Sequence, residues 1–219
     1  MSYKLKSRWL SSAKYPRKSP YAMTPQGIVV HNTAGDASAA EEAAAMVGNS
    51  SAVSFHVVID EEYAVECIPF SRNAFHAGDG AQGYANRNLI GIEIARSAEE
   101  SGDRFRRAEE NAALYIAHVC VQYGWTSAQL HQHNWYSATE CPHRTKAHWS
   151  DFLAKVDENI ATIKASSEDH PAPSAHRSHS SPSEKPSTSP QKTETAPSTP
   201  QSAPSAKRWA LRSSGKTAR

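Results

Sequence analysis

The apolar residues of the first 165 positions fall into short runs and longer helical patterns. Four short runs have the composition of buried strands, and they occupy residues 27–33, 53–60, 64–69 and 89–95. The acidic turn Asp60-Glu61-Glu62 separates the second run from the third, which predicts a β-hairpin. Residues 71–88 are expected to form a long loop, of a length that is usually functional in a compact domain.

Helical patterns occur in the segments between and after these runs. Ser38 and Glu41 have the spacing of a capping box, and an Ala-rich stretch follows them to Gly48. Apolar residues recur every three or four positions from 104 to 124, and again from 149 to 163. Because strands and helices interleave, we expect an α/β domain with a central mixed β-sheet flanked by helices, followed by a disordered C-terminal tail.

The composition changes sharply after this domain. Residues 166–206 are rich in Ser, Pro and Thr, and they contain no aromatic residue and no Leu, Ile or Val. Such a stretch buries too little apolar area to offset its chain entropy, so a disordered linker is expected there. The predicted organisation is listed in chain order: a basic segment at 1–20, a folded domain at 21–165, the linker at 166–206 and a short basic tail at 207–219.

Charge is distributed unevenly, although the net charge is only +2. The first eighteen residues hold six Lys or Arg and no acidic residue, and the last thirteen hold five. These ends are either solvated segments or a means of attachment to anionic wall polymers. No recognition motif for nucleic acid accompanies them, so no nucleic-acid partner is expected. The N-terminus lacks the apolar core of a signal peptide and no run reaches membrane-spanning length, which favours synthesis in the cytoplasm.

Two histidines and a cysteine carry the candidate chemistry. His31 ends the first apolar run, while His133 and Cys141 bracket a segment that closes on Pro142. Two imidazoles and a thiolate suit a tetrahedral Zn²⁺ and leave its fourth position for water, which is the ligand number of a catalytic site. If the three residues converge in space, the expected chemistry is metal-assisted hydrolysis.

Five motifs occur in a fixed order around these residues, at 29–35, 54–60, 74–78, 88–94 and 133–142. Over roughly residues 21–155 this order resembles the zinc-dependent N-acetylmuramoyl-L-alanine amidases of type 2, which are related to the peptidoglycan recognition proteins. The resemblance is greatest to the wall-lytic endolysins of phages and prophages. It implies that residues 21–165 are a zinc amidase domain in which His31, His133 and Cys141 hold Zn²⁺, with His131 as the competing ligand.

The resemblance also implies catalytic residues. Glu93 matches the family's acidic residue, which handles the proton of the attacking water. A carboxylate in an otherwise apolar strand is costly unless it is paired or functional, so the alternative is a buried structural ion pair. Many relatives have tyrosine where this chain has Phe55, and some have lysine where it has Thr139. The group that stabilises the oxyanion is therefore open between Thr139 and His56, and His56 is equally well explained as a structural histidine of the sheet.

Substrate contacts are expected from several segments. His76 lies in the loop that the family places beside the bound glycan and peptide, and Phe55 belongs to the strand that relatives place near the metal. Asn86 and Arg87 are either substrate contacts or ordinary loop residues. Trp135 is either an aromatic wall for a sugar or an anchor of its loop.

Together these features predict a cell-wall hydrolase. The expected reaction is hydrolysis of the amide between N-acetylmuramic acid and L-alanine in peptidoglycan, by a monomer that reaches the wall through a holin or on lysis. The first alternative is a non-catalytic peptidoglycan-binding module, but receptor-type relatives that lose zinc lack the cysteine present here as Cys141. The second is a cysteine hydrolase with Cys141 as nucleophile. Pro142 argues against it, because a proline in that position opposes the helix N-terminus that often activates such a thiol.

Overall fold

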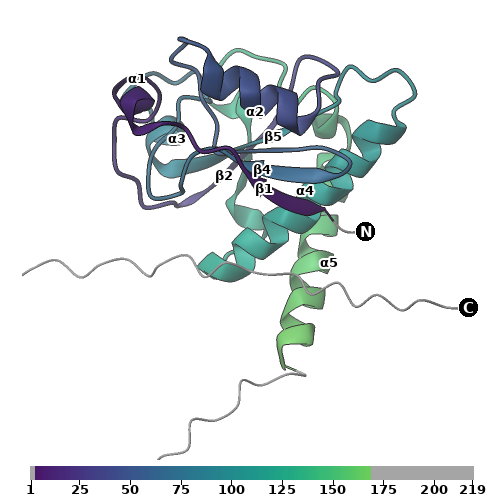
Figure 1. Ribbon diagram of the computed structural model, residues 1–219. Helices are drawn as coiled ribbons and strands as arrows, with labels where there is room; N and C mark the ends of the chain where they lie inside the picture. Colours follow the sequence, from purple (N-terminus) through teal and green to yellow (C-terminus); the bar gives the residue numbers. More distant parts are fainter. Residues whose placement is uncertain (1–2, 169–219) are drawn as a thin grey trace, which may run out of the picture. The chain divides into compact units, whose positions relative to one another are not determined.

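A six-stranded β-sheet forms the centre of the computed structural model, which describes residues 3–168 (Figure 1). The strand order is β1-β4-β3-β5-β2-β6. The bounds are Lys4–Ser7 for β1, Gly27–Asn32 for β2, Val57–Ile59 for β3, Tyr63–Glu66 for β4, Leu89–Ile94 for β5 and Leu130–Gln132 for β6. Every neighbouring pair is parallel except the β3–β4 hairpin, so the expected mixed sheet is confirmed.

Helices pack on both faces of this sheet. The α-helices are α1 (Tyr15–Lys18), α2 (Ala39–Gly48), α3 (Tyr84–Asn88), α4 (Asp103–Tyr123) and α5 (Trp149–Glu168). Short 3-10 helices lie at Ser12–Lys14, Ser127–Gln129, His133–Trp135 and Thr145–His148. Helix α2 lies on one side of the strands, and α4 and α5 pack together on the other (Figure 1).

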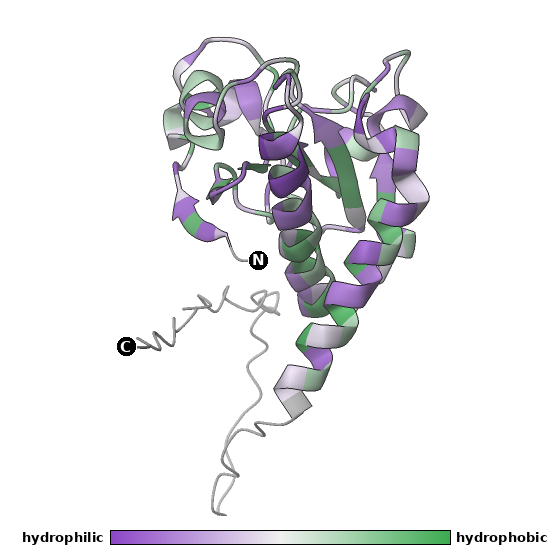
Figure 2. Cartoon of the chain, turned by 90° about the vertical axis from the view of Figure 1, so that its right-hand side faces the viewer, coloured by the Kyte–Doolittle hydropathy of each residue, from purple (hydrophilic) through white to green (hydrophobic). Residues whose placement is uncertain are grey.

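The alternation of side chains along the strands separates two packing layers. Ile90, Ile92 and Ile94 of β5 are fully buried in the larger hydrophobic core, which α4 and α5 complete. Because successive strand residues point to opposite faces, Gly91 and Glu93 face the α2 side. Figure 2 shows hydrophobic colour on the central strands and alternating hydrophilic and hydrophobic colour along the helices. The larger core thus lies between the sheet and helices α4 and α5, whereas Gly91 and Glu93 face the layer that contains α2.

The first twenty residues differ from the separate basic segment that composition predicts. Residues 4–7 form β1, which pairs in parallel with β4 at one edge of the sheet, and Leu10 is buried. A four-residue strand with two lysines has too weak an apolar signal to be recognised from periodicity. Residues 166–168, which composition assigns to the linker, belong to α5, because this helix continues to Glu168. Residues 169–219, which include most of the linker and the basic tail, lie outside the described residues.

Other element boundaries in the structure also differ from those predicted from the sequence. The strand expected at 53–60 is only Val57–Ile59, and β6 has three residues and was not predicted. The loop expected at 71–88 contains the short helix α3 at its end. Within the part of the chain that the structure describes, no helix is both long enough and apolar enough to span a membrane.

The capping box at the start of α2 generates a stability prediction. The Ser38 hydroxyl accepts a hydrogen bond from the Glu41 N–H, and the Glu41 carboxylate accepts one from the Ser38 N–H at 2.8 Å. Replacing Ser38 with Ala leaves a backbone donor of the first turn without its partner and is expected to cost about 1 kcal/mol. Urea unfolding measures the change, with Ser50→Ala, an exposed serine just beyond the same helix, as the control. Equal stability of the two variants would contradict the assigned cap.

Candidate active site

The three predicted metal ligands come together at one end of the sheet. Nitrogen atoms of His31 and His133 and the sulfur of Cys141 all lie within 4.8 Å of one another. His31 is on β2, His133 begins a 3-10 helix after β6, and Cys141 follows eight residues later. In residues 3–168 this is the one group of three or more His, Cys, Asp or Glu with metal-binding spacing. The arrangement has the donor types and number expected for a zinc site with an open position.

A hydrogen-bonded relay fixes the tautomer of His31. The Nε2 atom of His76 lies 3.1 Å from the Leu89 carbonyl, which can only accept, so this nitrogen carries the proton. The remaining nitrogen, Nδ1 of His76, accepts from Nε2 of His31 at 3.0 Å. Nδ1 of His31 is therefore the lone-pair nitrogen, and it lies 3.9 Å from the sulfur of Cys141.

Burial keeps both rings of this relay neutral. It lowers the pKa of His76 to about 3 and also lowers that of His31, whose neighbours His76 and His133 add to the effect. A neutral imidazole with a directed lone pair is the form that binds a metal ion. Gly91 makes the relay possible, because a β-carbon at that position would lie 2.5 Å from Cγ of His76. The sequence showed Gly91 only as an interruption of an apolar run.

The other two predicted ligands, His133 and Cys141, also have atoms that could bind a metal ion. His133 contacts the Ser137 hydroxyl through Nε2 at 3.0 Å, while its buried Nδ1 has no partner among residues 3–168. Such an orphaned buried nitrogen is unusual in a folded protein and fits the role of a metal ligand. Cys141 accepts the N–H of Asn32 at 3.3 Å on its sulfur. His131 is engaged by the hydroxyl of Tyr136 at 2.8 Å, and it is outside the cluster.

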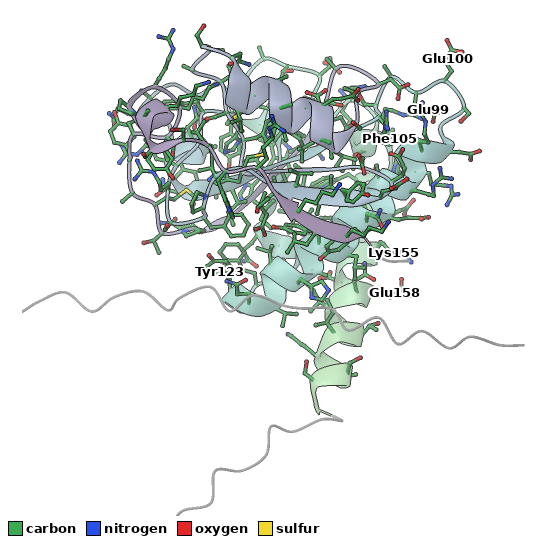
Figure 3. All side chains as sticks on the ribbon, in the orientation of Figure 1. Glu99, Glu100, Phe105, Tyr123, Lys155 and Glu158 are labelled. Carbon is green, nitrogen blue, oxygen red and sulfur yellow. The ribbon has the colours of Figure 1, made fainter. Side chains whose placement is uncertain are left out.

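Asn32 holds the cysteine segment against the sheet, a role that sequence reasoning missed. Its Oδ1 accepts the N–H groups of Arg144 at 2.9 Å and Thr145 at 3.1 Å, and its Nδ2 donates to the Thr145 hydroxyl at 3.0 Å. The guanidinium of Arg144 in turn lies 4.3 Å from the ring centre of Phe105, near the start of α4 (Phe105 is labelled in Figure 3). The one sequence feature that could have indicated this role of Asn32 is its position directly after His31.

An open groove of about 640 Å³ runs past the three ligands. Its lining includes four of the other predicted site residues, Phe55, His76, Glu93 and Thr139. The helix α2 and the segment after it supply further lining, namely Glu42, Ala45, Met46, Asn49 and Val53. The groove therefore joins the candidate metal-binding cluster to the surface formed by α2 and the segment after it.

Glu93 lies next to His31 in this groove. The two are paired residues of the neighbouring parallel strands β5 and β2, so their side chains share one face of the sheet. Within the described residues the Glu93 carboxylate has neither a hydrogen bond nor an ion pair, and the structural ion pair considered from sequence has no partner there. Burial raises the pKa of Glu93 to about 8, and the negative charge of Glu42 adds to this shift.

Thr139 offers a donor near the cysteine. Its hydroxyl oxygen accepts the N–H of Cys141 at 3.4 Å, which leaves the hydroxyl proton available to the groove. A hydroxyl can stabilise a developing oxyanion by donating this proton as a hydrogen bond.

His56 lies away from the groove and has the contacts of a structural histidine. Its Nε2 donates to the Arg72 carbonyl at 2.9 Å, and its Nδ1 accepts the N–H of Gly91 at 2.9 Å. The side chain is fully buried, and it does not line the groove. These contacts favour the structural alternative for His56, in which it joins β5 to the loop around Arg72.

Asn86 and Trp135 also lie outside the groove lining. The Asn86 Oδ1 accepts the N–H groups of His76 and Ala77, both at 2.8 Å, so this side chain shapes the loop that carries His76 rather than facing the groove. Trp135 is 55% exposed and packs edge-on against Trp149. The sequence alone could not show whether Asn86 and Trp135 contact the substrate or the protein itself. The protein partner of Asn86 lies in an irregular loop, and that of Trp135 is distant along the chain.

Comparisons with known proteins agree on one family. A family model described as N-acetylmuramoyl-L-alanine amidase matches residues 21–144. N-acetylmuramoyl-L-alanine amidase XlyB of Bacillus subtilis (strain 168) is 38% identical over 162 residues, which are 73% of this chain and 51% of XlyB. N-acetylmuramoyl-L-alanine amidase CwlA of the same organism is 35% identical over 165 residues, which are 74% of this chain and 60% of CwlA. The chain therefore spans only about half to three fifths of these relatives.

A solved structure gives the same result for the fold. The structure of PlyL is similar with a TM-score of 0.67 and 38% sequence identity, covering 70% of this chain and 97% of the PlyL chain. The described unit thus corresponds to nearly all of that chain.

The burial of His56 predicts a loss of stability in acid. Its pKa is about 4 in the folded protein, below the unfolded value of 6.5, because burial disfavours the charged ring. The stabilising contribution is complete above pH 6.5 and is lost as the pH falls through the folded pKa, up to about 3 kcal/mol. The free energy of unfolding should therefore decrease more between pH 7 and pH 4.5 in the wild type than in the His56→Gln variant. His31 and His76 are present in both proteins, so the stability that they cost in acid is common to both. An equal decrease of the unfolding free energy in the two proteins would therefore contradict the prediction.

Proposed function

This chain belongs to the N-acetylmuramoyl-L-alanine amidase family, and from that premise we propose that it hydrolyses the amide bond between N-acetylmuramic acid and L-alanine in peptidoglycan. The observation that carries the proposal is the convergence of two imidazole nitrogens and one sulfur beside the carboxylate of Glu93, in an open groove. Wall lysis as a monomer, after release through a holin or on lysis, is part of the same proposal. Attachment to anionic wall polymers through the basic tail at 207–219 remains a prediction.

Zn²⁺ is the metal that this donor set fits best. His31 and His133 would each bind it through Nδ1, since their Nε2 atoms contact His76 and Ser137, and Cys141 would bind through its sulfur. When bound, zinc lowers the pKa of a coordinated water to about 7 and polarises a carbonyl oxygen.

Glu93 is proposed to move the proton of the reaction. In its ionised form the Glu93 side chain accepts a proton from the water that attacks the lactyl carbonyl carbon, and it then gives this proton to the amine of L-alanine as the C–N bond breaks. The proton balance closes, because the carboxylate is regenerated and the product acid and amine share the elements of one water. Its lack of any hydrogen bond within residues 3–168 leaves both oxygens available for this transfer.

Thr139 and His76 have supporting roles in the proposal. The Thr139 hydroxyl donates a hydrogen bond to the carbonyl oxygen as negative charge develops on it. His76 lines the groove, but both ring nitrogens are already engaged, so we assign it the orientation of His31 rather than a polar substrate contact. Phe55 supplies an apolar wall in the groove, and a phenyl ring brings no hydroxyl that could assist the oxyanion.

The alternative of a cysteine hydrolase is disfavoured by the surroundings of Cys141. Burial, and secondarily the charge of Glu93, raises the pKa of its thiol to about 12. Activated nucleophilic cysteines have the opposite shift, because a cation or a helix N-terminus stabilises their thiolate. A peptidoglycan receptor would bind in the same groove, and turnover separates it from the amidase.

Mass analysis of digested peptidoglycan tests the reaction. We expect new amino termini of L-alanine and no new reducing sugars, with activity abolished by a chelator and restored by zinc. New reducing ends would indicate a glycosidase, and chelator-resistant cleavage would contradict the metal site. Binding without cleavage would favour the receptor.

Replacing Glu93 with Gln tests the proton-transfer role. We expect kcat to fall roughly 10²- to 10⁴-fold, because the amide cannot accept the proton, while one zinc per chain stays bound. The control is Glu66→Gln, since Glu66 is also a strand carboxylate whose pKa is raised by burial but lies outside the groove lining. Loss of zinc from the Glu93→Gln protein would identify a structural role instead.

A further inference from the structure

Two lysines of the N-terminal segment bind the end of α2, where the helix contributes to the groove wall. The Lys14 ammonium donates to three carbonyls there, those of Val47 at 2.6 Å, Gly48 at 2.7 Å and Asn49 at 3.3 Å. A cation at this position satisfies the terminal carbonyls and the negative end of the helix dipole. Lys14 therefore accounts for the capping of α2 without help from a second lysine.

Lys18 makes a different set of contacts. It is fully buried, and its ammonium donates to the side-chain oxygen of Asn49 at 2.9 Å and to the Val53 carbonyl at 2.9 Å. Burying an ammonium is unfavourable unless polar partners compensate for its lost hydration. The helix end already has its cation, so the position of Lys18 requires another explanation.

The contacts of Lys18 fix the orientation of the Asn49 amide. Oδ1 of Asn49 accepts from the Lys18 ammonium and from the N–H of Ser51 at 3.0 Å. Both partners are pure donors, so the oxygen must face them and the NH₂ group must face the other way. In residues 3–168 this NH₂ group has no hydrogen-bond partner, and Asn49 lines the groove. Asn49 is an exposed residue, so its oriented NH₂ group is a donor that a ligand in the groove can reach.

We propose that Asn49 is a substrate-binding residue whose NH₂ group donates to a carbonyl oxygen of the peptide stem, and that Lys18 is the residue that positions it. This inference rests on the proposed function, since the stem is what would extend along the groove from the cleaved amide.

The charges of the groove favour a neutral acceptor. Glu42 and Glu140 line it, and their carboxylates disfavour a further anion in the same space. Ala45, Met46 and Val53 supply an apolar surface around Asn49. A peptide backbone, with carbonyl oxygens and small apolar side chains, matches a wall of this composition.

Steady-state kinetics on a soluble muropeptide tests the pair. Asn49→Asp keeps an oxygen for Lys18 and Ser51 but removes the donor, and Lys18→Met removes the group that orients the amide. We expect each variant to raise KM roughly 3- to 10-fold, the effect of one neutral hydrogen bond, with kcat within about twofold of the wild type and zinc content unchanged. Lys14→Met is the matched control, expected to lower the melting temperature and leave KM unchanged.

The double variant tests whether Lys18 acts through Asn49. If it does, Asn49→Ala combined with Lys18→Met raises KM no more than either change alone. Effects that multiply, or an unchanged KM in either single variant, would overturn the proposal. Should Lys18→Met fail to fold, an unchanged KM in Asn49→Asp and Asn49→Ala still overturns it.

Matched muropeptides with free or amidated stem carboxylates identify the acceptor. An equal effect of Asn49→Ala on both supports a backbone carbonyl, whereas an effect confined to the free acid overturns that assignment in favour of a carboxylate. Failure of the wild type to cleave any muropeptide would instead refute the proposed function, so the two failures are distinguishable.

Discussion

The candidate site depends on the parallel pairing of β2 with β5. Their register sets His31 directly beside Glu93, and the alternation of side chains places both on the face opposite the large core. A slip of either strand by one residue would turn its own side chain, His31 or Glu93, into the isoleucine-rich layer and separate the two residues. Burial of Ile28, Ile90 and Ile92 against α4 and α5 therefore holds the register that brings a ligand and a carboxylate together.

Around this pair, polar partners within residues 3–168 engage one ring nitrogen of each histidine and the sulfur of the cysteine. His76 occupies one nitrogen of His31, Ser137 one nitrogen of His133, and the Asn32 N–H contacts the cysteine sulfur. In the proposed metal site, such partners would orient the ligands in advance and reduce the entropy lost on binding. The absence of a β-carbon at Gly91 belongs to the same arrangement, because it lets the His76 ring lie against β5.

The sequence predicted what depends on local pattern. Helical periodicity placed α4 and α5, the capping box placed α2, and the order of motifs indicated the three ligands. It did not predict β1 or β6, whose three or four residues are stabilised by pairing with strands distant along the chain. For the same reason His56 and Asn86 were ambiguous as site residues. Their hydrogen bonds to Arg72, Gly91 and the His76 loop exist only after folding, and the residue type alone fits a ligand contact equally well.

The N-terminal lysines show that the number of charges in a segment does not by itself predict whether the segment is solvated or packed. Six cations without an acid suggest a solvated or surface-binding end, yet Lys14 and Lys18 donate to α2 and to the segment after it. Carbonyls at a helix C-terminus lack partners within the helix, so a nearby ammonium is stabilised without any carboxylate. The short helix α1 thus belongs to the folded unit and supports one wall of the groove. The position of a charge relative to unpaired backbone groups, rather than the sum of charges, decides its role here.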